Sequence, residues 1–425
     1  MMSILWFSTG FAVVAALFTG FVFDYWPLGF VLLIVGSSLI ALTGYSAGTF
    51  RMQASADRII HTTVFFNIVV CLIALLGLAA MYYDRAFLRG IDYSTLGMAG
   101  ARAELTRVGD RGGIISVLGN LFSTAIYLPT INLVFDWERW GRSRYAVLAF
   151  VIMGVIGLTY ITGGRTALLI AVAVAAAAML GRGALGMRRL PSFLSPVSLT
   201  VSVVVLVGLF GTVFAVRAST FGVSSGAVYL SQMCFHLSQP SLEIAVRCST
   251  IAQSTDFQVL DDVVNYGISV LLYAFHVAWV GQSVFGAVNP GALTSFEGPQ
   301  ALFLGRFGLE LVATDYAGYF IPAAASLVYD FGFLEMALGF AILGLITGFF
   351  HAKMVMGRFF FGRVAFCFAC AGLIISVMIS PVNLPIFLLA GLSIMSVVAA
   401  TTFARLIGLI PSSSVLREFR RKPGY

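Results

Sequence analysis

An arginine stands directly after two glycines, at Gly163, Gly164 and Arg165, where two apolar runs of the chain meet. A charge within a membrane is costly, so such an arginine usually faces a cavity, a partner or a substrate. The glycines let the backbone approach a ligand closely, and Thr166 opens a helix whose free amide groups and dipole favour an anion. A guanidinium fork suits phosphate or pyrophosphate in the same way. The sequence therefore predicts that Arg165 binds pyrophosphate; the alternative is that its side chain reaches lipid head groups.

Two further arginines are candidates for the same anion site. Arg217 follows the apolar run 194–216, and the chain reaches it after crossing the membrane from Arg165 and returning. Both arginines should therefore lie on one side, where two guanidinium groups without an acidic partner close in sequence favour a doubly charged ligand. The alternative is two independent arginines at the membrane interface. Arg306, in the long segment that follows, is predicted to join the site.

Aromatic and polar residues alternate in that long segment, at Tyr266, Tyr273, His276 and Trp279. Sugar rings stack on aromatic faces, so the three aromatic residues are predicted to bind a glycan. Histidine has an ordinary pKa close to neutral pH, so His276 is predicted to act as the general base that takes a proton from an acceptor hydroxyl. The alternative, for His276 and for His236, is a structural hydrogen bond.

Carboxylates beside apolar stretches supply other candidates for the base. Glu310 and Asp315 are predicted as alternative catalytic residues, and Asp330 is a third carboxylate of this kind. Each of the three could instead pair with Arg306. The adjacent pair Asp261-Asp262 is better explained as a solvated helix start than as a metal site. We therefore expect neither a metal nor a cofactor.

Composition places these residues in a membrane protein. Of the 425 residues, 60% are hydrophobic and 10% are charged, and the mean hydropathy is +0.98, which is outside the range of soluble domains. The net charge of +7 comes mostly from basic residues in short connections and in the tail, which indicates membrane topology and not nucleic-acid binding. Runs of about 20 apolar residues predict ten spanning helices, at 3–22, 28–49, 59–82, 113–134, 145–161, 166–181, 194–216, 332–351, 364–379 and 384–409.

These runs predict an all-α polytopic membrane protein with both termini in the cytoplasm. In that orientation most basic residues lie inside, as the positive-inside rule requires. The large outer loop should contain amphipathic or re-entrant helices, and if two of its apolar stretches cross the bilayer the number of spans becomes twelve. Cys234 and Cys248 would pair if that loop is extracytoplasmic, which the sequence leaves open. The predicted regions are N-terminal transmembrane helices at 1–216, the loop at 217–331, C-terminal transmembrane helices at 332–410 and a basic, disordered cytoplasmic tail at 411–425.

Four features occur together between residues 145 and 351. They are Gly164-Arg165-Thr166-Ala167-Leu168 after a span, Arg217 at the end of the next outward span, a long outer loop, and Asp330-Phe331-Gly332 before a helix with Gly339, Gly344 and Gly348. This combination resembles the Wzy-type polymerases, which join the oligosaccharide repeat units of bacterial O-antigen and exopolysaccharide. One position departs from the family pattern, because Glu335 stands where a glycine or a small residue is expected.

The resemblance implies a glycosyltransferase C-like fold in the bacterial inner membrane. It implies undecaprenyl-pyrophosphate-linked oligosaccharide as the substrate on the periplasmic face, and a chain-length regulator as a partner. It also implies metal-independent, inverting glycosyl transfer, in which arginines stabilise the charge that develops on the leaving pyrophosphate.

Other functions share parts of this pattern. An O-antigen ligase shares most of it, and the sequence does not separate a ligase from a polymerase. A transporter or flippase of lipid-linked glycans should show internal repeats and polar residues at mid-membrane in several spans. In this chain the charges concentrate in two outer segments, which favours an enzyme. A structural subunit would not explain arginines at two successive outer span ends.

Overall fold

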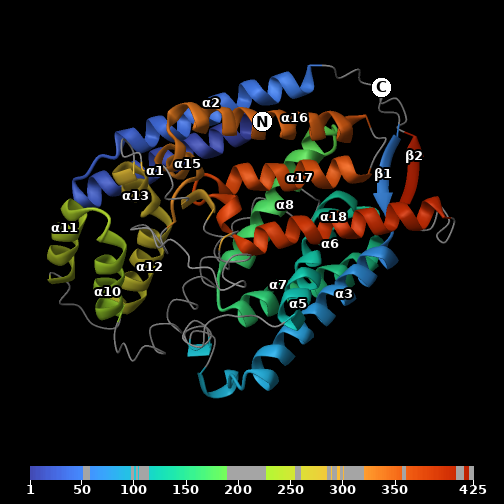
Figure 1. The fold of residues 1–425 in the computed structure, drawn as a ribbon, viewed down its shortest axis with the longest axis horizontal. Coiled ribbons are helices and arrows are strands. Elements are labelled where there is room, and N and C mark those ends of the chain that lie inside the picture. The colour runs from blue at the N-terminus through green and yellow to red at the C-terminus, as the bar shows by residue number, and fades with distance from the viewer. Residues whose placement is uncertain are drawn as a thin grey trace.

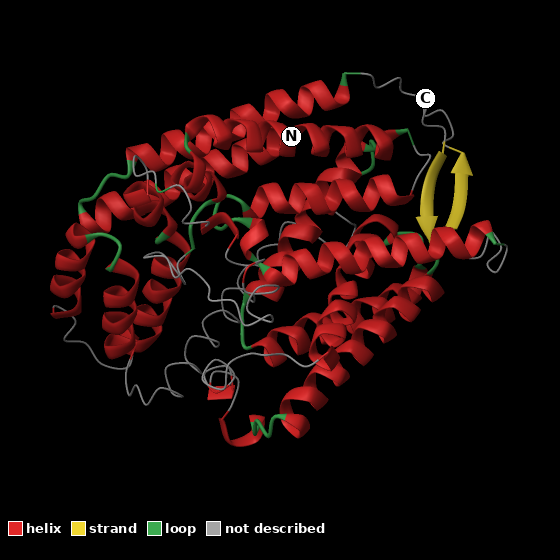
Figure 2. Ribbon diagram, viewed as in Figure 1, coloured by secondary structure: helices red, strands yellow, loops and turns green. Residues whose placement is uncertain are grey.

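The chain folds as a bundle of helices with one small sheet at its end (Figures 1 and 2). The computed structural model describes residues 1–50, 58–96, 100–101, 104, 114–188, 226–253, 260–284, 289, 294–296, 300, 320–356, 360–407 and 416–420. Its elements, in chain order, are α1 (Met2–Phe23), α2 (Leu28–Thr49), β1 (Arg58–Thr62), α3 (Val64–Tyr83), η1 (Asp84–Leu88), α5 (Ile114–Ser123), η2 (Thr124–Ile126), α6 (Tyr127–Asp136), η3 (Gly141–Ser143), α7 (Arg144–Thr162), α8 (Thr166–Ala184), α10 (Gly226–Ser238), α11 (Leu242–Gln253), α12 (Leu260–Phe275), α13 (Val277–Val284), η4 (Thr294–Phe296), α15 (Ala323–Phe331), α16 (Phe333–Val355), α17 (Phe360–Ile375), η6 (Pro381–Asn383), α18 (Pro385–Leu406) and β2 (Leu416–Arg420).

The prediction of an all-α polytopic membrane protein is confirmed in outline. Within the described residues, nine helical segments are long and apolar enough to cross a membrane, and a tenth apolar helix, α17, is shorter at 16 residues. Eight of the nine coincide with predicted spans. The predicted span 194–216 lies outside the described residues. The nine are Met2–Phe23, Leu28–Thr49, Val64–Leu88, Ile114–Asp136, Gly141–Thr162, Thr166–Ala184, Val264–Val284, Phe333–Val355 and Pro385–Ala404.

The ninth segment, Val264–Val284, lies within the predicted large outer loop, 217–331. It joins α12 to α13 through a turn at His276. Its length and composition are sufficient for a membrane span. The twelve-span alternative predicts a span in this stretch. The second apolar stretch of the loop in that alternative is 309–329; its residues 309–319 lie outside the described residues, and residues 323–329 belong to the short helix α15.

The first residues of the predicted span 59–82 form a strand instead of a helix. Strand β1 pairs antiparallel with β2, with Arg58 opposite Arg420 and Thr62 opposite Leu416. Helix α3 then begins after Thr63, whose side chain accepts a hydrogen bond from the amide of Phe66 in the first turn. The expectation of a disordered tail is therefore wrong for Leu416–Arg420, because these residues form a strand that pairs with β1 through backbone hydrogen bonds.

Helices α2 and α16 are in backbone contact, and they run side by side in Figure 1. A Cβ atom added to Gly44 would lie 2.1 Å from the carbonyl oxygen of Ala341, and one added to Gly344 would lie 2.0 Å from that of Ala41. Small residues spaced in this way let two membrane helices approach closely. Two of the three α16 glycines in the motif quoted above, Gly344 and Gly348, are therefore packing residues against α2.

The two ends of the bundle are built from different elements. Helices α10, α11 and α12 pack together at one end, and the β1–β2 sheet lies at the other (Figure 1). A disulfide joins Cys234 of α10 to Cys248 of α11, with the two Cα atoms 5.6 Å apart. The pairing that the sequence left open is thus present in the structure.

Candidate functional site

The turn that carries Arg165 lies between α7 and α8. Helix α7 ends at Thr162, and the next residue, Gly163, has φ 62° and ψ 20°, a left-handed conformation that glycine adopts without steric cost. Arg165 is the residue immediately before α8, and its carbonyl accepts the amide of Leu169 at 3.0 Å. The glycine therefore turns the chain so that Arg165 opens the new helix at its positive end.

The side chain of Arg165 is buried, with 8% of its surface exposed. Its guanidinium carbon lies 4.2 Å from the centre of the Tyr273 ring, which belongs to α12. This distance is well inside the range of a cation–π contact. The structure thus brings together a predicted pyrophosphate-binding residue and a predicted glycan-binding residue from distant parts of the chain.

His276 lies next to this pair and is 1% exposed. Its ring centre is 5.6 Å from that of Tyr273 and 5.5 Å from that of Phe320. The Nδ1 atom is 2.7 Å from the carbonyl oxygen of Tyr273, and the amide of Phe320 lies 3.1 Å from Nε2. The ring is therefore neutral, with Nδ1–H donating to the carbonyl and Nε2 accepting from the amide. It could accept a substrate proton only if the bond to Phe320 opened.

The other two aromatic candidates differ in accessibility. Tyr266 is half-buried on α12, with its ring centre 5.8 Å from that of Tyr229. Trp279 is 1% exposed, donates through Nε1 to the carbonyl of Leu237 at 2.9 Å, and packs against Phe23. Of the two, only Tyr266 presents accessible surface to a glycan in this conformation. The remaining predicted site residues, Arg217, Arg306, Glu310 and Asp315, lie outside the described residues.

A second buried arginine, which is not among the predicted site residues, supports the turn. Arg85 of η1 is 5% exposed and donates to the carbonyl of Ile161 near the end of α7. Tyr93 donates to the same carbonyl at 3.2 Å. Burial raises the pKa of Tyr93 above its ordinary value, so its hydroxyl stays a hydrogen-bond donor to a higher pH. Arg85 and Tyr93 together hold the end of α7 that precedes Gly163. The position of Arg85 directly after an apolar run was the feature of the sequence that could have indicated this role.

Asp330, one of the carboxylates considered as a base, holds a short element in place. Its Oδ1 accepts the amide of Thr294 at 2.8 Å and the hydroxyl of Thr294 at 2.7 Å. Its Oδ2 accepts the amide of Ser295 at 2.6 Å, and the residue is fully buried. These three hydrogen bonds join the carboxylate to two neighbouring residues of η4. Asp330 therefore positions η4 against the end of α15.

A buried polar cluster lies at the opposite end of the bundle, beside β1. Asp136 is fully buried, and it accepts from the amide and hydroxyl of Thr62 at 3.0 and 2.8 Å and contacts the ring of His61. Arg363 lies 3.5 Å from Asp136 and donates to Asn132 at 2.6 Å. Partners on several elements compensate these buried charges, so breaking the cluster would leave a charge uncompensated. We interpret it as structural.

No metal site is evident in the part of the chain that the structure describes, since no three His, Cys, Asp or Glu side chains gather there. Comparisons of the chain with models of known protein families, with curated proteins and with solved structures gave no match.

Proposed function

We propose that this protein is a membrane glycosyltransferase of the Wzy type, which polymerises oligosaccharide repeat units carried on undecaprenyl pyrophosphate. The observation that carries the proposal is the buried guanidinium of Arg165, at the start of α8, stacked 4.2 Å from the ring of Tyr273. A cation at a helix amino terminus suits a pyrophosphate group, and an adjacent aromatic ring suits a sugar. The pyrophosphate of a lipid-linked glycan would thus meet the guanidinium of Arg165, and its sugar would lie beside the ring of Tyr273.

The reaction proceeds by displacement at the anomeric carbon of the donor glycan. The oxygen of an acceptor hydroxyl forms the new glycosidic bond, and the bond from the anomeric carbon to the pyrophosphate oxygen breaks. The electron pair leaves with the pyrophosphate, whose developing charge Arg165, Arg217 and Arg306 stabilise. A base, His276, Glu310 or Asp315, takes the hydroxyl proton. Attack opposite to the leaving group inverts the anomeric configuration, and the growing polymer stays linked to lipid.

The disulfide and the charge distribution support a periplasmic site in the inner membrane. Disulfides persist in oxidising compartments, and Cys234–Cys248 joins α10 to α11 within the predicted outer loop. Helix α10 packs on α12, which carries Tyr273, so the disulfide and Arg165 belong to the same end of the bundle. Both termini then lie in the cytoplasm, together with the β1–β2 sheet.

Purified protein in detergent is expected to elongate a lipid-pyrophosphate oligosaccharide in the presence of EDTA. A transferase needs only donor and acceptor, whereas a transporter needs two compartments, so a ladder of products spaced by one repeat unit would come only from an enzyme. Products are resolved by gel electrophoresis, and boiled protein is the control. Absence of any ladder with functional substrate would contradict the proposal, and transfer only to a lipid A core acceptor would identify a ligase.

The same assay separates two roles for His276. If His276 is the base, both His276→Ala and His276→Gln should lower turnover by about a hundredfold or more. Glutamine can still accept the amide hydrogen of Phe320, but it cannot take up a proton. A change of less than about threefold in His276→Gln, far below a general-base contribution, would instead show that the ring positions Phe320, and Glu310 and Asp315 would be tested next.

A further inference from the structure

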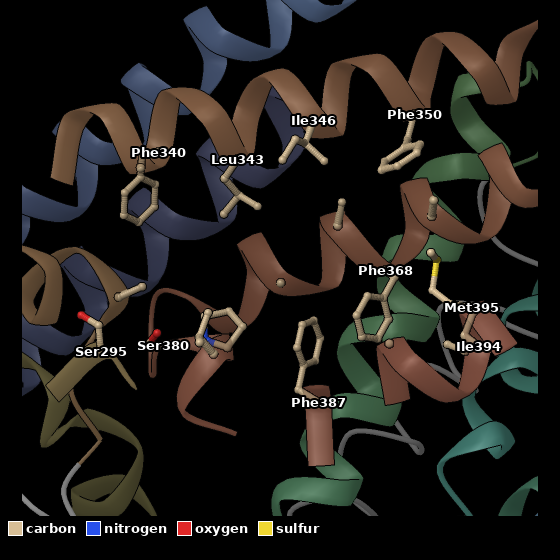
Figure 3. A pocket seen from close by; sticks show the side chains of 18 of the residues that line it. Ser295, Phe340, Leu343, Ile346, Phe350, Phe368, Ser380, Phe387, Ile394 and Met395 are labelled. Atoms are coloured by element: carbon tan, nitrogen blue, oxygen red, sulfur yellow. The ribbon is translucent and has the colours of Figure 1, made fainter. Parts of the chain in front are cut away.

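A groove runs between α16, α17 and α18 on the side of the bundle (Figure 3). Its volume is about 490 Å³, which is within the range of sites that bind small molecules. Its walls are almost entirely apolar. Ile346 and Met395 line it and keep 42% and 53% of their surface exposed, so the groove opens where spanning helices face lipid. We call it the lateral groove.

The lateral groove is long and narrow. Phe340, Leu343, Ile346 and Phe350 of α16 point into it in one row (Figure 3), and at 1.5 Å per residue this row extends about 15 Å along the helix axis. Phe368 and Phe387, stacked with ring centres 4.2 Å apart, form part of the opposite wall. One row of side chains along one helix suits one extended hydrocarbon chain, and not the two chains of a phospholipid.

One end of the lateral groove is polar. Ser295 lies there, 3% exposed, and its hydroxyl has no hydrogen-bond partner among the described residues. Ser380 lies near it (Figure 3), in the turns that connect α17, which ends at Ile375, to α18. Irregular backbone at membrane depth is tolerated where it is buried in protein or lines a cavity. The groove therefore suits a molecule with a long apolar part and one polar end.

Residues 320–323 lie between the polar end of the lateral groove and the candidate functional site, because the amide of Ser380 donates to the carbonyl of Ile321 at 3.2 Å. Ala323 lines the groove, and Phe320, three residues earlier, donates its amide to His276. The Phe320 ring centre is 5.1 Å from that of Tyr273, which stacks on Arg165. A lipid head group at this end of the groove would thus lie beside the segment that contacts His276 and Tyr273.

We propose that the lateral groove binds the single chain of a polyprenyl lipid carrier, with the phosphate end at Ser295 and the chain running toward Met395. This inference rests on the proposed function, since that function supplies a single-chain carrier as the substrate. The groove then sets the position of the pyrophosphate relative to Arg165.

The test uses the purified full-length protein in nanodiscs and undecaprenyl phosphate with a diazirine in its chain. Light should label groove residues of α16, α17 or α18, as identified by mass spectrometry. Leu343→Trp, which fills the groove, should reduce labelling by about tenfold, because excluding two methylene groups from an apolar site already weakens binding that much. The matched control is Ile342→Trp, because Ile342 is the neighbouring residue and is 55% exposed. It should label like the unmodified protein.

Equal labelling of the two variants would overturn the inference. So would a probe that excess phosphatidylglycerol displaces as readily as undecaprenyl phosphate does. If Leu343→Trp fails to elute as folded protein, Ala369→Leu on the opposite wall fills the same space and must give the same loss. Labelling requires no glycosyl transfer. A protein that labels in the groove but makes no polymer would refute the proposed function alone, and one that makes polymer without groove labelling would refute the lipid site alone.

Discussion

Replacing Arg165 with alanine is expected to abolish polymer in cells while the protein level and the lipid-linked single repeat unit stay unchanged. Loss of one preorganised group that stabilises a transition-state charge lowers turnover by about 10²–10³-fold. Arg165→Lys should rescue poorly, because lysine keeps the charge but loses the bidentate fork and the planar stack on Tyr273. Polymer length is measured by gel electrophoresis, and protein level by immunoblot.

The chain offers a matched control for this variant. Arg144 begins α7, the helix whose other end precedes Arg165, and its guanidinium carbon lies 4.6 Å from the ring centre of Trp137. Arg144→Ala therefore removes the same group and the same kind of contact at the opposite end of one helix, and polymer should remain. Polymer of normal length from Arg165→Ala would refute the pyrophosphate site. Arg217→Ala and Arg306→Ala extend the experiment to the other two predicted arginines.

Most spans could be predicted because hydropathy and length act locally. The error at the start of α3 has a different origin, since the pairing of β1 with β2 joins residues near the two ends of the chain and no local pattern encodes it. A local signal was nevertheless present at Thr63, which caps α3 through its bond to the amide of Phe66. Threonine before an apolar run is a typical helix start.

The end of α17 was also beyond prediction from hydropathy. The apolar run continues through Ile379, but the helix ends at Ile375, and the following turn places the carbonyl of Ser376 against the amide of Ala323 at 2.9 Å. That turn forms the polar end of the lateral groove. Tertiary contact, and not local composition, decides where such a helix stops.

The candidate site was only partly predictable for the same reason. The sequence alone indicated that Arg165 follows a glycine turn between two helices, because glycine at such a break in two apolar runs is a local signal. Its contact with Tyr273 could not, because residue spacing does not indicate which helices meet. The hydrogen bond from the amide of Phe320 to His276 involves a backbone group, which a search for reactive side chains does not detect.

Replacing Gly44 with leucine is expected to unfold the bundle or to destabilise it by more than about 3 kcal/mol, the upper part of the range for overpacked cores. The new Cβ alone would lie 2.1 Å from the carbonyl oxygen of Ala341. The clash is with backbone, so no side-chain rotation relieves it, and α2 must separate from α16. The measurement is thermal stability in detergent, followed by size-exclusion chromatography of the protein that stays soluble after heating.

Gly36→Leu is the matched control, because Gly36 belongs to the same helix and a Cβ there meets no atom within 4 Å. Both substitutions replace glycine with leucine within one apolar helix, so helix propensity and hydrophobicity change equally and only the contact with α16 differs. Gly36→Leu should therefore keep the melting temperature of the unmodified protein or raise it slightly. Equal stability of the two variants would refute backbone contact between α2 and α16. It would also remove the packing role inferred for Gly344 and Gly348, because their close approach to α2 depends on the same contact.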